Sequence, residues 1–320
     1  MKTLPDWLRC HLENPPPQKT GLHRWIYRTV CLLAEHGIRD GETLCRIMQH
    51  ATASAGRDTT REIADAVDSV LSGGAKRHRH PSWPKRDAAA IAEVLKNGIS
   101  ESKLHALSPA PCCESSREIL PLLFPGDPLL CLGFSNSKFH TRPLTDWLGI
   151  MKSRNGQFIV PSPLTSVFGT TVAGKTTEKS NANTGAREYL VIEFDFNPKE
   201  KEEDADLLAF GGQFGLTSTR DLCASIAFHL GQRAPLALVV FSGGKSLHCW
   251  FPVRGLPEEN QREFFAYACR LGADPVTWTP SQFVRLPRGR NRDKQQTQTV
   301  IYFDHTLCPQ TPNTKHHAQP

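Results

Sequence analysis

The sequence predicts an α+β protein, in which a small N-terminal helical bundle precedes a larger domain built on an open antiparallel or mixed sheet. Over residues 20–72, apolar side chains recur every three or four positions, which is typical of amphipathic helices. From about residue 87 onwards, helical and strand-like patterns alternate. The last third of the chain reads as strand, helix, hairpin, helix and strand, an order that fits a sheet covered by helices on one face.

Residues 1–75 are expected to form the helical module. Three amphipathic helices are indicated, and glycines follow the first and the third of them. Such helices bury their apolar stripes against one another, so a small bundle is expected. The apolar residues that define the three helices are Trp25, Ile26, Val30 and Leu33, then Leu44, Ile47 and Met48, then Ile63, Val67, Val70 and Leu71.

Residues 76–110 are expected to form a basic linker with a short helix. Residues 76–81 read Lys-Arg-His-Arg-His-Pro, and Trp83 follows closely. This stretch is either a solvated connector or an arm that contacts phosphates while Trp83 stacks on a base. A short apolar repeat, formed by Ile91, Val94 and Leu95, indicates the helix.

Residues 111–310 are expected to hold the main domain, and residues 311–320 a tail. Helices are expected from about residue 219 and over residues 258–271. The charged residues 198–206 are expected to form a loop, and the Ser-Gly-Gly at 242–244 a turn. Apolar runs predict strands at 129–132, 158–160, 188–196, 235–241, 246–253 and 297–303.

The composition is typical of a globular protein that can bind a polyanion. A formal net charge of +6 is compatible with such a partner. The ten cysteines are scattered without a Cys-x-x-Cys pair, which argues against a disulfide scaffold and a zinc site. Residues 1–9 lack the apolar stretch of a signal peptide, and no later apolar run reaches membrane-spanning length. We therefore expect a soluble, cytoplasmic protein without a membrane partner.

Two acids, Glu193 and Asp195, stand two positions apart in the strand expected at 188–196. Side chains alternate along a strand, so both carboxylates point to one face while Ile192 and Phe194 point to the other. Neighbouring carboxylates repel each other unless a cation neutralises them, and their hard oxygens suit Mg²⁺ or Mn²⁺. The pair indicates a metal site, and a solvated edge strand is the alternative.

A glycine-rich turn, Ser-Gly-Gly-Lys-Ser-Leu-His at 242–248, lies between two expected strands. Glycines let a backbone approach phosphate oxygens closely, and Lys245 supplies a positive charge. Alternation places Ser246 and His248 on one face. The turn favours contact with an incoming triphosphate, and a purely structural role for His248 is the alternative.

A third cluster begins at Asp274, just after the helix expected at 258–271. Residues 283–292 contain four arginines, among them Arg285 and Arg288, in a turn-rich stretch. The planar guanidinium group matches phosphate geometry through paired hydrogen bonds. We interpret this segment as a phosphate-binding one, and a solvated basic loop is the alternative.

Taken together, these motifs resemble the catalytic core of the archaeo-eukaryotic primase superfamily, especially its plasmid and phage branch. The resemblance rests on Glu-x-Asp at 193–195, Gly-Gly-Lys-Ser-Leu-His at 243–248, the isolated Asp274 and Arg-Leu-Pro-x-Gly-x-Asn at 285–291. It covers roughly residues 120–305 and implies an RRM-like catalytic sheet. At the position of Glu193 the family usually has Asp. The longer side chain of Glu193 still reaches a cation. The helical module also resembles one that usually follows the family's core.

The resemblance implies a primase or primase-polymerase that joins NTPs or dNTPs on a single-stranded DNA template, during replication of a chromosome or a mobile element. Two Mg²⁺ or Mn²⁺ ions are the implied cofactors. The chain encodes no helicase motor, so a separate replicative helicase is an expected partner. The implied metal ligands are Glu193, Asp195 and Asp274, which form the catalytic set with His248, and the implied nucleotide contacts are Lys245, Ser246, His248, Arg285 and Arg288.

Two other functions stay open on the sequence. Residues 169–176 match the P-loop pattern Gly-x-x-x-x-Gly-Lys-Thr, which predicts an ATPase where a buried strand leads into it and a helix starts at the lysine. Pro161 and Pro163 interrupt the approach and loop-like residues 177–185 follow, which argues against a P-loop. The second alternative is a non-catalytic replication initiator that binds DNA, although the retention of all three acids argues against it.

Overall fold

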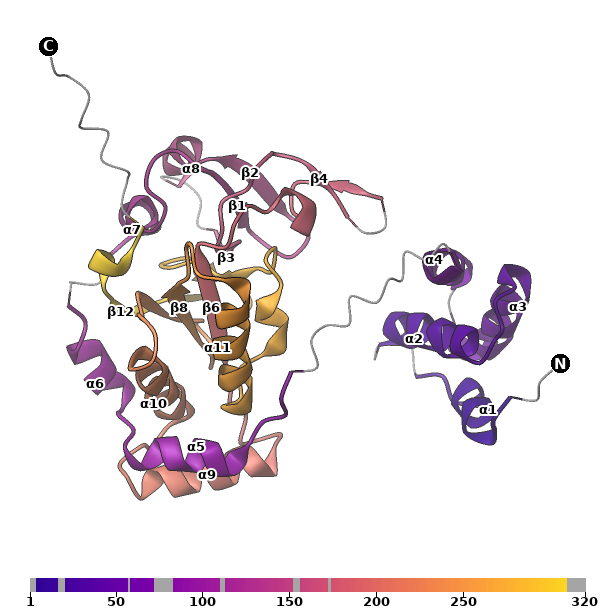
Figure 1. Cartoon of the computed structure of the whole chain (residues 1–320), viewed down its shortest axis with the longest axis horizontal. Coiled ribbons are helices and arrows are strands. Elements are labelled where there is room, and N and C mark those ends of the chain that lie inside the picture. The colour runs from indigo at the N-terminus through magenta and orange to yellow at the C-terminus, as the bar shows by residue number, and fades with distance from the viewer. Residues whose placement is uncertain are drawn as a thin grey trace, which may run out of the picture. The chain divides into compact units, whose positions relative to one another are not determined.

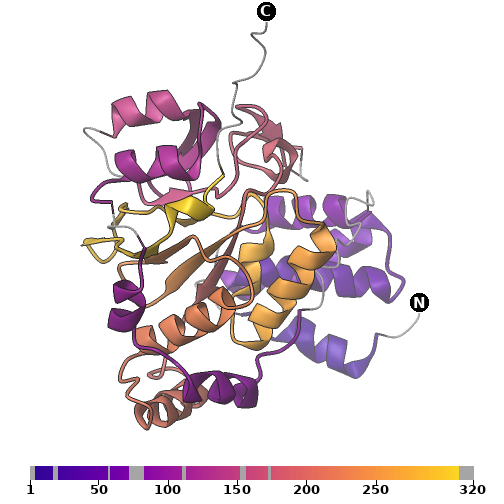
Figure 2. The same cartoon turned by 60° about the vertical axis from the view of Figure 1, so that its left-hand side comes forward.

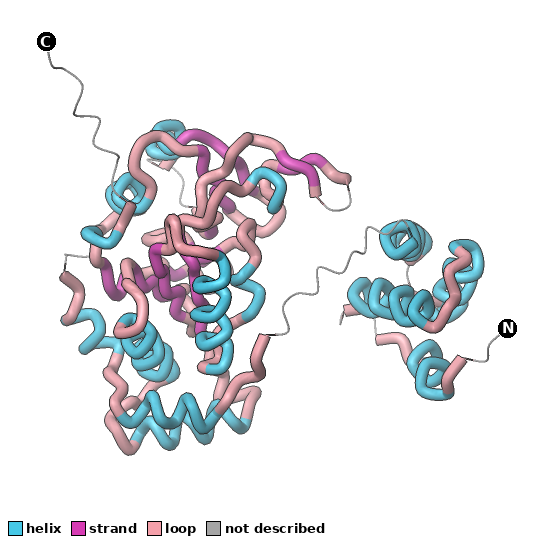
Figure 3. The backbone as a smooth tube through the Cα atoms, in the orientation of Figure 1, coloured by secondary structure: helices cyan, strands magenta, loops and turns pink. Residues whose placement is uncertain are grey.

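The computed structural model describes residues 4–16, 21–56, 58–71, 83–109, 113–151, 156–171 and 174–309. The chain divides into two compact units, Met1–Ser82 and Trp83–Pro320. In the described part of the chain the first unit contains helices and loops, and the strands all belong to the second (Figures 1 and 3). The basic stretch at 76–81 and the tail at 311–320 lie outside the described residues.

The first unit is a bundle of amphipathic helices. They are α1 (Asp6–Glu13), α2 (Leu22–Glu35), α3 (Gly41–Ala51) and α4 (Thr60–Leu71), with a 3₁₀ turn, η1 (Ala53–Ala55), between the last two. Asp40 begins α3, because its side chain accepts a hydrogen bond from the Thr43 amide at 2.8 Å. The helices expected over 20–72 are present, and α1 is an additional one outside that range. Their shared core includes Leu8, Val30, Leu44, Met48 and Ile63.

A four-stranded antiparallel sheet is the frame of the second unit. In chain order its strands are β6 (Tyr189–Phe194), β7 (Leu238–Phe241), β8 (Leu247–Pro252) and β12 (Val300–Phe303). In space the order is β12-β7-β8-β6, so the β7–β8 hairpin is central and β6 and β12 are edges. Helices α9 (Glu202–Gly212) and α10 (Thr219–Gly231) follow β6, and α11 (Glu258–Arg270) follows β8. This mixture of helices and antiparallel strands confirms the predicted α+β class.

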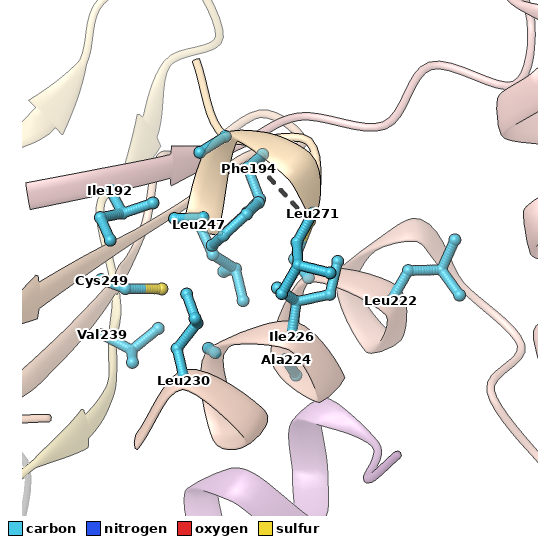
Figure 4. Packing of buried hydrophobic residues seen from close by; sticks show 14 of the residues in the cluster. Ile192, Phe194, Leu222, Ala224, Ile226, Leu230, Val239, Leu247, Cys249 and Leu271 are labelled. Carbon is cyan, nitrogen blue, oxygen red and sulfur yellow. Dashed lines mark hydrogen bonds between the residues drawn. The ribbon is translucent and has the colours of Figure 1, made fainter. Parts of the chain in front are cut away.

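One face of this main sheet is covered by helices. Ile192 and Phe194 of β6 and Leu247 of β8 lie in the same core cluster as Ile226 and Leu230 of α10 (Figure 4). Helices α5 (Ala88–Lys96) and α6 (Glu101–Ala106) contribute to the same core, and α5, α9 and α10 lie on one side of the sheet (Figures 1 and 2). Full burial of each large apolar side chain stabilises the fold by about 1.5–3 kcal/mol, so this layer fixes which face of β6 is left for polar residues.

Helix α9 corrects the prediction of a charged loop at 198–206. The helix begins at Glu202, and its first turn carries Glu202, Glu203 and Asp204. Negative charge is favourable there, because the unpaired amides leave the first turn of a helix partly positive. Leu207, one turn further on, is buried in the core. The charge density at this point marks the start of a helix.

A second sheet packs on the other face of the main sheet. Its order is β2-β1-β3-β9, and its strands are β1 (Leu129–Gly133), β2 (Phe139–Pro143), β3 (Phe158–Ile159) and β9 (Val284–Arg285). Leu130, Ile159 and Val284 of this sheet share a core with Val240 and Trp250 of the main sheet. Helices α7 (Ser116–Leu123) and α8 (Leu144–Ile150) complete this layer, in the upper part of Figure 1. Strand β9 comes from the segment between α11 and β12, so this segment ties the two sheets together.

Two small hairpins and three further 3₁₀ turns complete the described structure. No described helix has both the length and the apolar character that crossing a lipid bilayer requires. The remaining elements are the hairpin β4 (Gly169–Thr170) with β5 (Thr176–Thr177), the hairpin β10 (Arg290–Asn291) with β11 (Gln296–Thr297), and the turns η2 (Asn181–Asn183), η3 (Pro275–Trp278) and η4 (His305–Leu307).

A buried ion pair joins α9 to the segment before α5. The Asp204 carboxylate is fully buried and pairs with the Arg86 guanidinium, which lies 4.8 Å over the centre of the Phe196 ring. Replacing Arg86 with Met leaves this carboxylate buried without its counter-ion. We therefore expect the free energy of unfolding of Arg86→Met to fall by about 3 kcal/mol, measured by urea unfolding with circular dichroism.

A second change tests that explanation. Adding Asp204→Asn to Arg86→Met removes the uncompensated charge and keeps an oxygen that can accept from the Asn197 amide, which donates to Asp204 at 2.6 Å. We expect the double variant to be more stable than Arg86→Met alone. If it is less stable, the loss in the single variant does not come from a buried unpaired carboxylate.

Candidate active site

The site is built around one cross-strand pair, Glu193 on β6 and His248 on β8. These residues lie directly opposite each other in the antiparallel register, and Nε2 of His248 is 3.5 Å from Oε1 of Glu193. Both side chains lie on the face opposite Ile192 and Phe194, toward the second sheet. His248 is 2% exposed, and neither of its ring nitrogens has a hydrogen-bond partner among the described residues.

Asp195 and Lys245 form the exposed edge of the site. Asp195 comes directly after β6, and its Oδ2 is 3.3 Å from Nζ of Lys245 in the glycine turn. Both side chains are partly exposed, at 40% for Asp195 and 48% for Lys245, so water weakens the attraction between them. Because the Lys245 ammonium group already lies beside it, the Asp195 carboxylate is accessible to a cation.

The glycine turn at 242–248 is held by its own backbone and by a neighbouring hairpin. The Ser242 amide donates to the Ser246 carbonyl at 3.0 Å, and the Ser246 amide donates to Oγ of Ser242 at 3.2 Å. Gly243 has a φ of 71°, and a Cβ there would lie 3.1 Å from Cβ of Asn291. Glycine is needed here both for the left-handed conformation and for the close approach of the β10–β11 hairpin.

Asp274 is next to Glu193 through the backbone. Its amide donates to the Glu193 carbonyl at 3.0 Å, which places the loop after α11 beside the end of β6. Gly272 turns the chain into this loop with a φ of 95°. The Asp274 carboxylate, however, accepts a hydrogen bond from the Val276 amide at 3.0 Å and so caps η3.

Arg285 reaches the site from the second sheet. It is paired with Phe158 across β3 and β9, and its guanidinium carbon lies 4.9 Å from the centre of the Phe158 ring. Its Nη1 is buried and has no hydrogen-bond partner among the described residues. Burial lowers the pKa of Arg285, while the negative charges of Glu193 and Asp293 act in the opposite direction. Sequence periodicity did not reveal this placement, because it depends on pairing between two distant short strands.

Arg288, which we expected at the triphosphate, is used to anchor the chain. Its Nε donates to the Cys113 carbonyl at 2.6 Å, and its backbone adopts a positive φ of 60°. Its amide also donates to the Gln298 carbonyl at 3.0 Å. The structure therefore gives Arg288 structural partners, and of the two expected phosphate-binding arginines it brings Arg285 to the acids.

Two further residues of the Arg-Leu-Pro-x-Gly-x-Asn segment, not assigned from the sequence, hold the site together. Nδ2 of Asn291 donates to the Ser242 carbonyl at 2.9 Å, which joins the β10–β11 hairpin to the glycine turn. A Cβ on Gly289 would lie 2.7 Å from the Gly156 carbonyl oxygen, so only glycine fits there. The spacing of the motif indicated these positions, but their partners are distant in sequence.

The three expected metal ligands do not form a finished metal site. In the ranges that the structure describes, no three His, Cys, Asp or Glu side chains are grouped so that they could hold one ion. The donor chemistry nevertheless fits a hard divalent cation. Glu193 at the end of β6 and Asp195 directly after it supply carboxylate oxygens, and the Lys245 ammonium group lies 3.3 Å from one oxygen of Asp195.

The segment that matches the P-loop pattern forms a hairpin. The Thr171 amide donates to the Lys175 carbonyl at 2.9 Å, and β5 runs on from Lys175 as an extended strand at Thr176–Thr177. A P-loop requires a helix to begin at this lysine, because the helix N-terminus helps bind the phosphates. Residues 172–173 lie outside the described residues. The described part of the segment does not have the P-loop conformation.

The environment of His248 indicates how the stability of the protein depends on pH. Burial lowers the pKa of His248, Arg285 lowers it further, and Glu193, Asp274 and Asp195 oppose the change. A neutral buried histidine contributes its full share of stability above about pH 6.5, where the unfolded chain is also neutral, and loses it as the pH falls. His248→Gln does not titrate, so the stability of the wild type relative to His248→Gln should fall between pH 7.5 and pH 5.5.

Urea unfolding of both proteins at the two pH values measures this difference. A stability difference that is the same at both pH values would mean that His248 takes up its proton equally easily in the folded and unfolded chains.

Comparison with protein-family models, curated proteins and solved structures finds no match to this chain.

Proposed function

We propose that the chain is a primase or primase-polymerase, a metal-dependent nucleotidyltransferase that joins NTPs or dNTPs on a single-stranded DNA template. The observation that carries the proposal is the convergence of acids, a buried imidazole and two basic groups at one place. They come from four segments: the end of β6, the glycine turn with β8, the loop after α11, and β9. The residues are Glu193, Asp195, Lys245, His248, Asp274 and Arg285.

Unpartnered buried polar atoms support a ligand at this site. Both ring nitrogens of His248 and Nη1 of Arg285 lack hydrogen-bond partners among the described residues. Buried polar groups in proteins are nearly always paired, and each unpaired one costs about 1–3 kcal/mol. A phosphate oxygen would satisfy both a neutral imidazole N–H and a guanidinium N–H. The unpaired atoms therefore support an anionic substrate group between β8 and β9.

The reaction that fits this arrangement is attack of a 3′ hydroxyl oxygen on the α-phosphorus of a nucleoside triphosphate. A P–O bond forms at the primer end, the bond to the pyrophosphate oxygen breaks, and the hydroxyl proton is released to water. Glu193 and Asp195, with Asp274 beside them, would hold divalent cations, and these would supply positive charge for the attacking hydroxyl and the leaving pyrophosphate. Lys245 and Arg285 would bind phosphate oxygens, and neutral His248 would donate a hydrogen bond to one of them.

The division of labour along the chain is also a proposal. Residues 111–310 would carry the nucleotidyl transfer, residues 76–110 would serve as a basic linker with helices, and the helical module of residues 1–75 would be an accessory. The position of β8 between β6 and β7 supports a split βαβ unit like that of an RRM sheet, whereas β12 pairs with β7 and so departs from the RRM strand order. A single-stranded template and a separate replicative helicase, acting on a chromosome or a mobile element, are the proposed partners.

The proposal predicts that Asp195→Asn loses template-directed nucleotide incorporation by roughly a hundredfold or more, because the amide cannot neutralise a metal ion. The measurement is extension of a labelled primer, and synthesis without a primer, on single-stranded DNA with Mg²⁺ or Mn²⁺ and with NTPs or dNTPs. Asp206→Asn is the matched control, since it removes one exposed carboxylate on α9.

Circular dichroism and thermal unfolding establish that both variants fold. Full incorporation by a folded Asp195→Asn protein would rule out the assigned site. A wild-type chain that binds DNA but makes no product would instead favour the non-catalytic initiator.

The proposal also predicts that the two lysines in glycine-rich segments, Lys245 and Lys175, differ in their effect on nucleotide binding. Lys245→Ala should weaken nucleotide binding by about tenfold or more, because a charged hydrogen bond to phosphate is lost. Lys175→Ala should leave nucleotide binding near the wild-type value, since Lys175 lies in the β4–β5 hairpin. Apparent nucleotide affinity and ATP hydrolysis are measured for both variants. The reverse ranking, with ATP hydrolysis lost in Lys175→Ala, would contradict the proposal.

A further inference from the structure

The β10–β11 hairpin exposes a cluster of cations beside the candidate site. Its side chains Arg290, Arg292 and Lys294 are all exposed, and Asp293 is the only acid in residues 288–297. We call these three side chains the hairpin cations. None of the residues proposed to act on the triphosphate belongs to them, so the hairpin is chemically available for another partner.

The hairpin holds its cations in an ordered turn. Oδ1 of Asn291 accepts from the Lys294 amide at 3.2 Å, and Nε2 of Gln295 donates to the Arg292 carbonyl at 2.6 Å. Nη2 of Arg290 donates to Oε1 of Gln295 at 3.0 Å. Gln295 itself takes a positive φ of 53°. The cations are therefore presented from a fixed backbone, which reduces the conformational entropy lost when they bind a partner.

Contacts on two sides place this hairpin at the edge of the site. Asn291 is bonded to the Ser242 carbonyl of the glycine turn, as described above. The Arg292 guanidinium carbon lies 5.5 Å from the centre of the Phe134 ring, at the end of β1. Phe134 begins the turn that carries exposed Lys138, whose carbonyl accepts from the Phe134 amide at 2.8 Å. The hairpin thus lies between the glycine turn and the β1–β2 turn.

The chemistry of this surface fits a polyanion. The hairpin cations and Lys138 outnumber Asp293 by four to one, and residues 292–297 are exposed and polar throughout, so the surface offers no apolar patch to a protein partner. A single-stranded nucleic acid presents one phosphate charge per nucleotide along a flexible backbone, and proteins bind such strands largely through grooves lined with Lys and Arg.

We propose that the hairpin cations bind the sugar-phosphate backbone of the DNA strand that enters the candidate site. The inference deepens the proposed function, on which it rests for the claim that a strand enters there. It assigns the partner surface to β10–β11. Backbone contacts of this kind position a strand without reading its sequence.

The test is the salt dependence of single-stranded DNA binding by the full chain. The probe is fluorescein-labelled oligo-dT, followed by anisotropy over a KCl series without nucleotide or metal. Arg290→Gln/Arg292→Gln/Lys294→Gln removes the hairpin cations. Lys96→Gln/Lys103→Gln/Lys201→Gln removes the same charge from exposed positions elsewhere in the same unit and is the control.

For the hairpin variant we expect the slope of log affinity against log salt to fall in magnitude by about 0.7 per lost contact, or about 2 in total. Its affinity should drop at least about tenfold at 0.1 M salt relative to the control variant. Thermal unfolding checks that both variants are folded. Equal slopes and affinities in the two variants would overturn the inference, and so would a wild-type chain that does not bind the probe.

Failure of this inference and failure of the proposed function give different results. Nucleotide incorporation is measured on the same proteins. Incorporation by the wild type, with DNA binding unaffected in the hairpin variant, overturns the assignment of the hairpin and leaves the polymerase proposal standing. Loss of DNA binding in the hairpin variant, when even the wild type incorporates no nucleotide, supports the hairpin surface and overturns the polymerase proposal.

Discussion

The register between β6 and β8 is the constraint on which the rest of the site depends. With Glu193 opposite His248, the alternate residues Ile192 and Phe194 enter the core under the helices. A slip of one residue would exchange the two faces of β6, placing a carboxylate among buried apolar side chains and apolar side chains at the site. Because burial of two large apolar residues is worth several kcal/mol, the helix-covered face of the sheet fixes the position of the acids on the other face.

The second sheet supplies the part of the site that the main sheet lacks. It supplies Arg285 through β9, and the packing of the two sheets buries His248. The result is a site in which the charges are only partly compensated. Lys245 neutralises Asp195 at the exposed edge, whereas His248 and Arg285 keep unpaired nitrogens inside. Proteins tolerate such local destabilisation chiefly where a ligand supplies the missing partners.

Local sequence patterns predicted the strands and turns that carry this site better than they predicted how those strands and turns pack together. Alternation predicted that Glu193 and Asp195 share one face of their strand, whereas only the family resemblance combined them with Lys245 and His248 in one site. The segment at 285–291 was harder, since its pattern does not show that β9 pairs with β3 or that Asn291 binds Ser242. Partners far apart in sequence are set by tertiary packing.

The short range of local sequence patterns also explains two features of the structure that the sequence did not indicate. The charged stretch after β6 resembled a loop because acids at a helix start give no apolar periodicity until the next turn. Arg288 and Arg285 are equivalent in composition and spacing, but in the structure Nε of Arg288 donates to the Cys113 carbonyl, a partner that the local sequence does not indicate. Composition alone could not separate these two arginines.

The central claim is that the acids at the end of β6 bind divalent cations together with a nucleoside triphosphate. Its most direct test is the anomalous scattering of Mn²⁺ in crystals of the full chain grown with Mn²⁺ and a non-hydrolysable triphosphate. The account predicts a manganese peak against the Glu193 and Asp195 carboxylates, with Lys245 released from Asp195 and phosphate density within hydrogen-bonding distance of His248 and Arg285. A triphosphate bound elsewhere, with the Lys245–Asp195 ion pair intact and no manganese at β6, would contradict it.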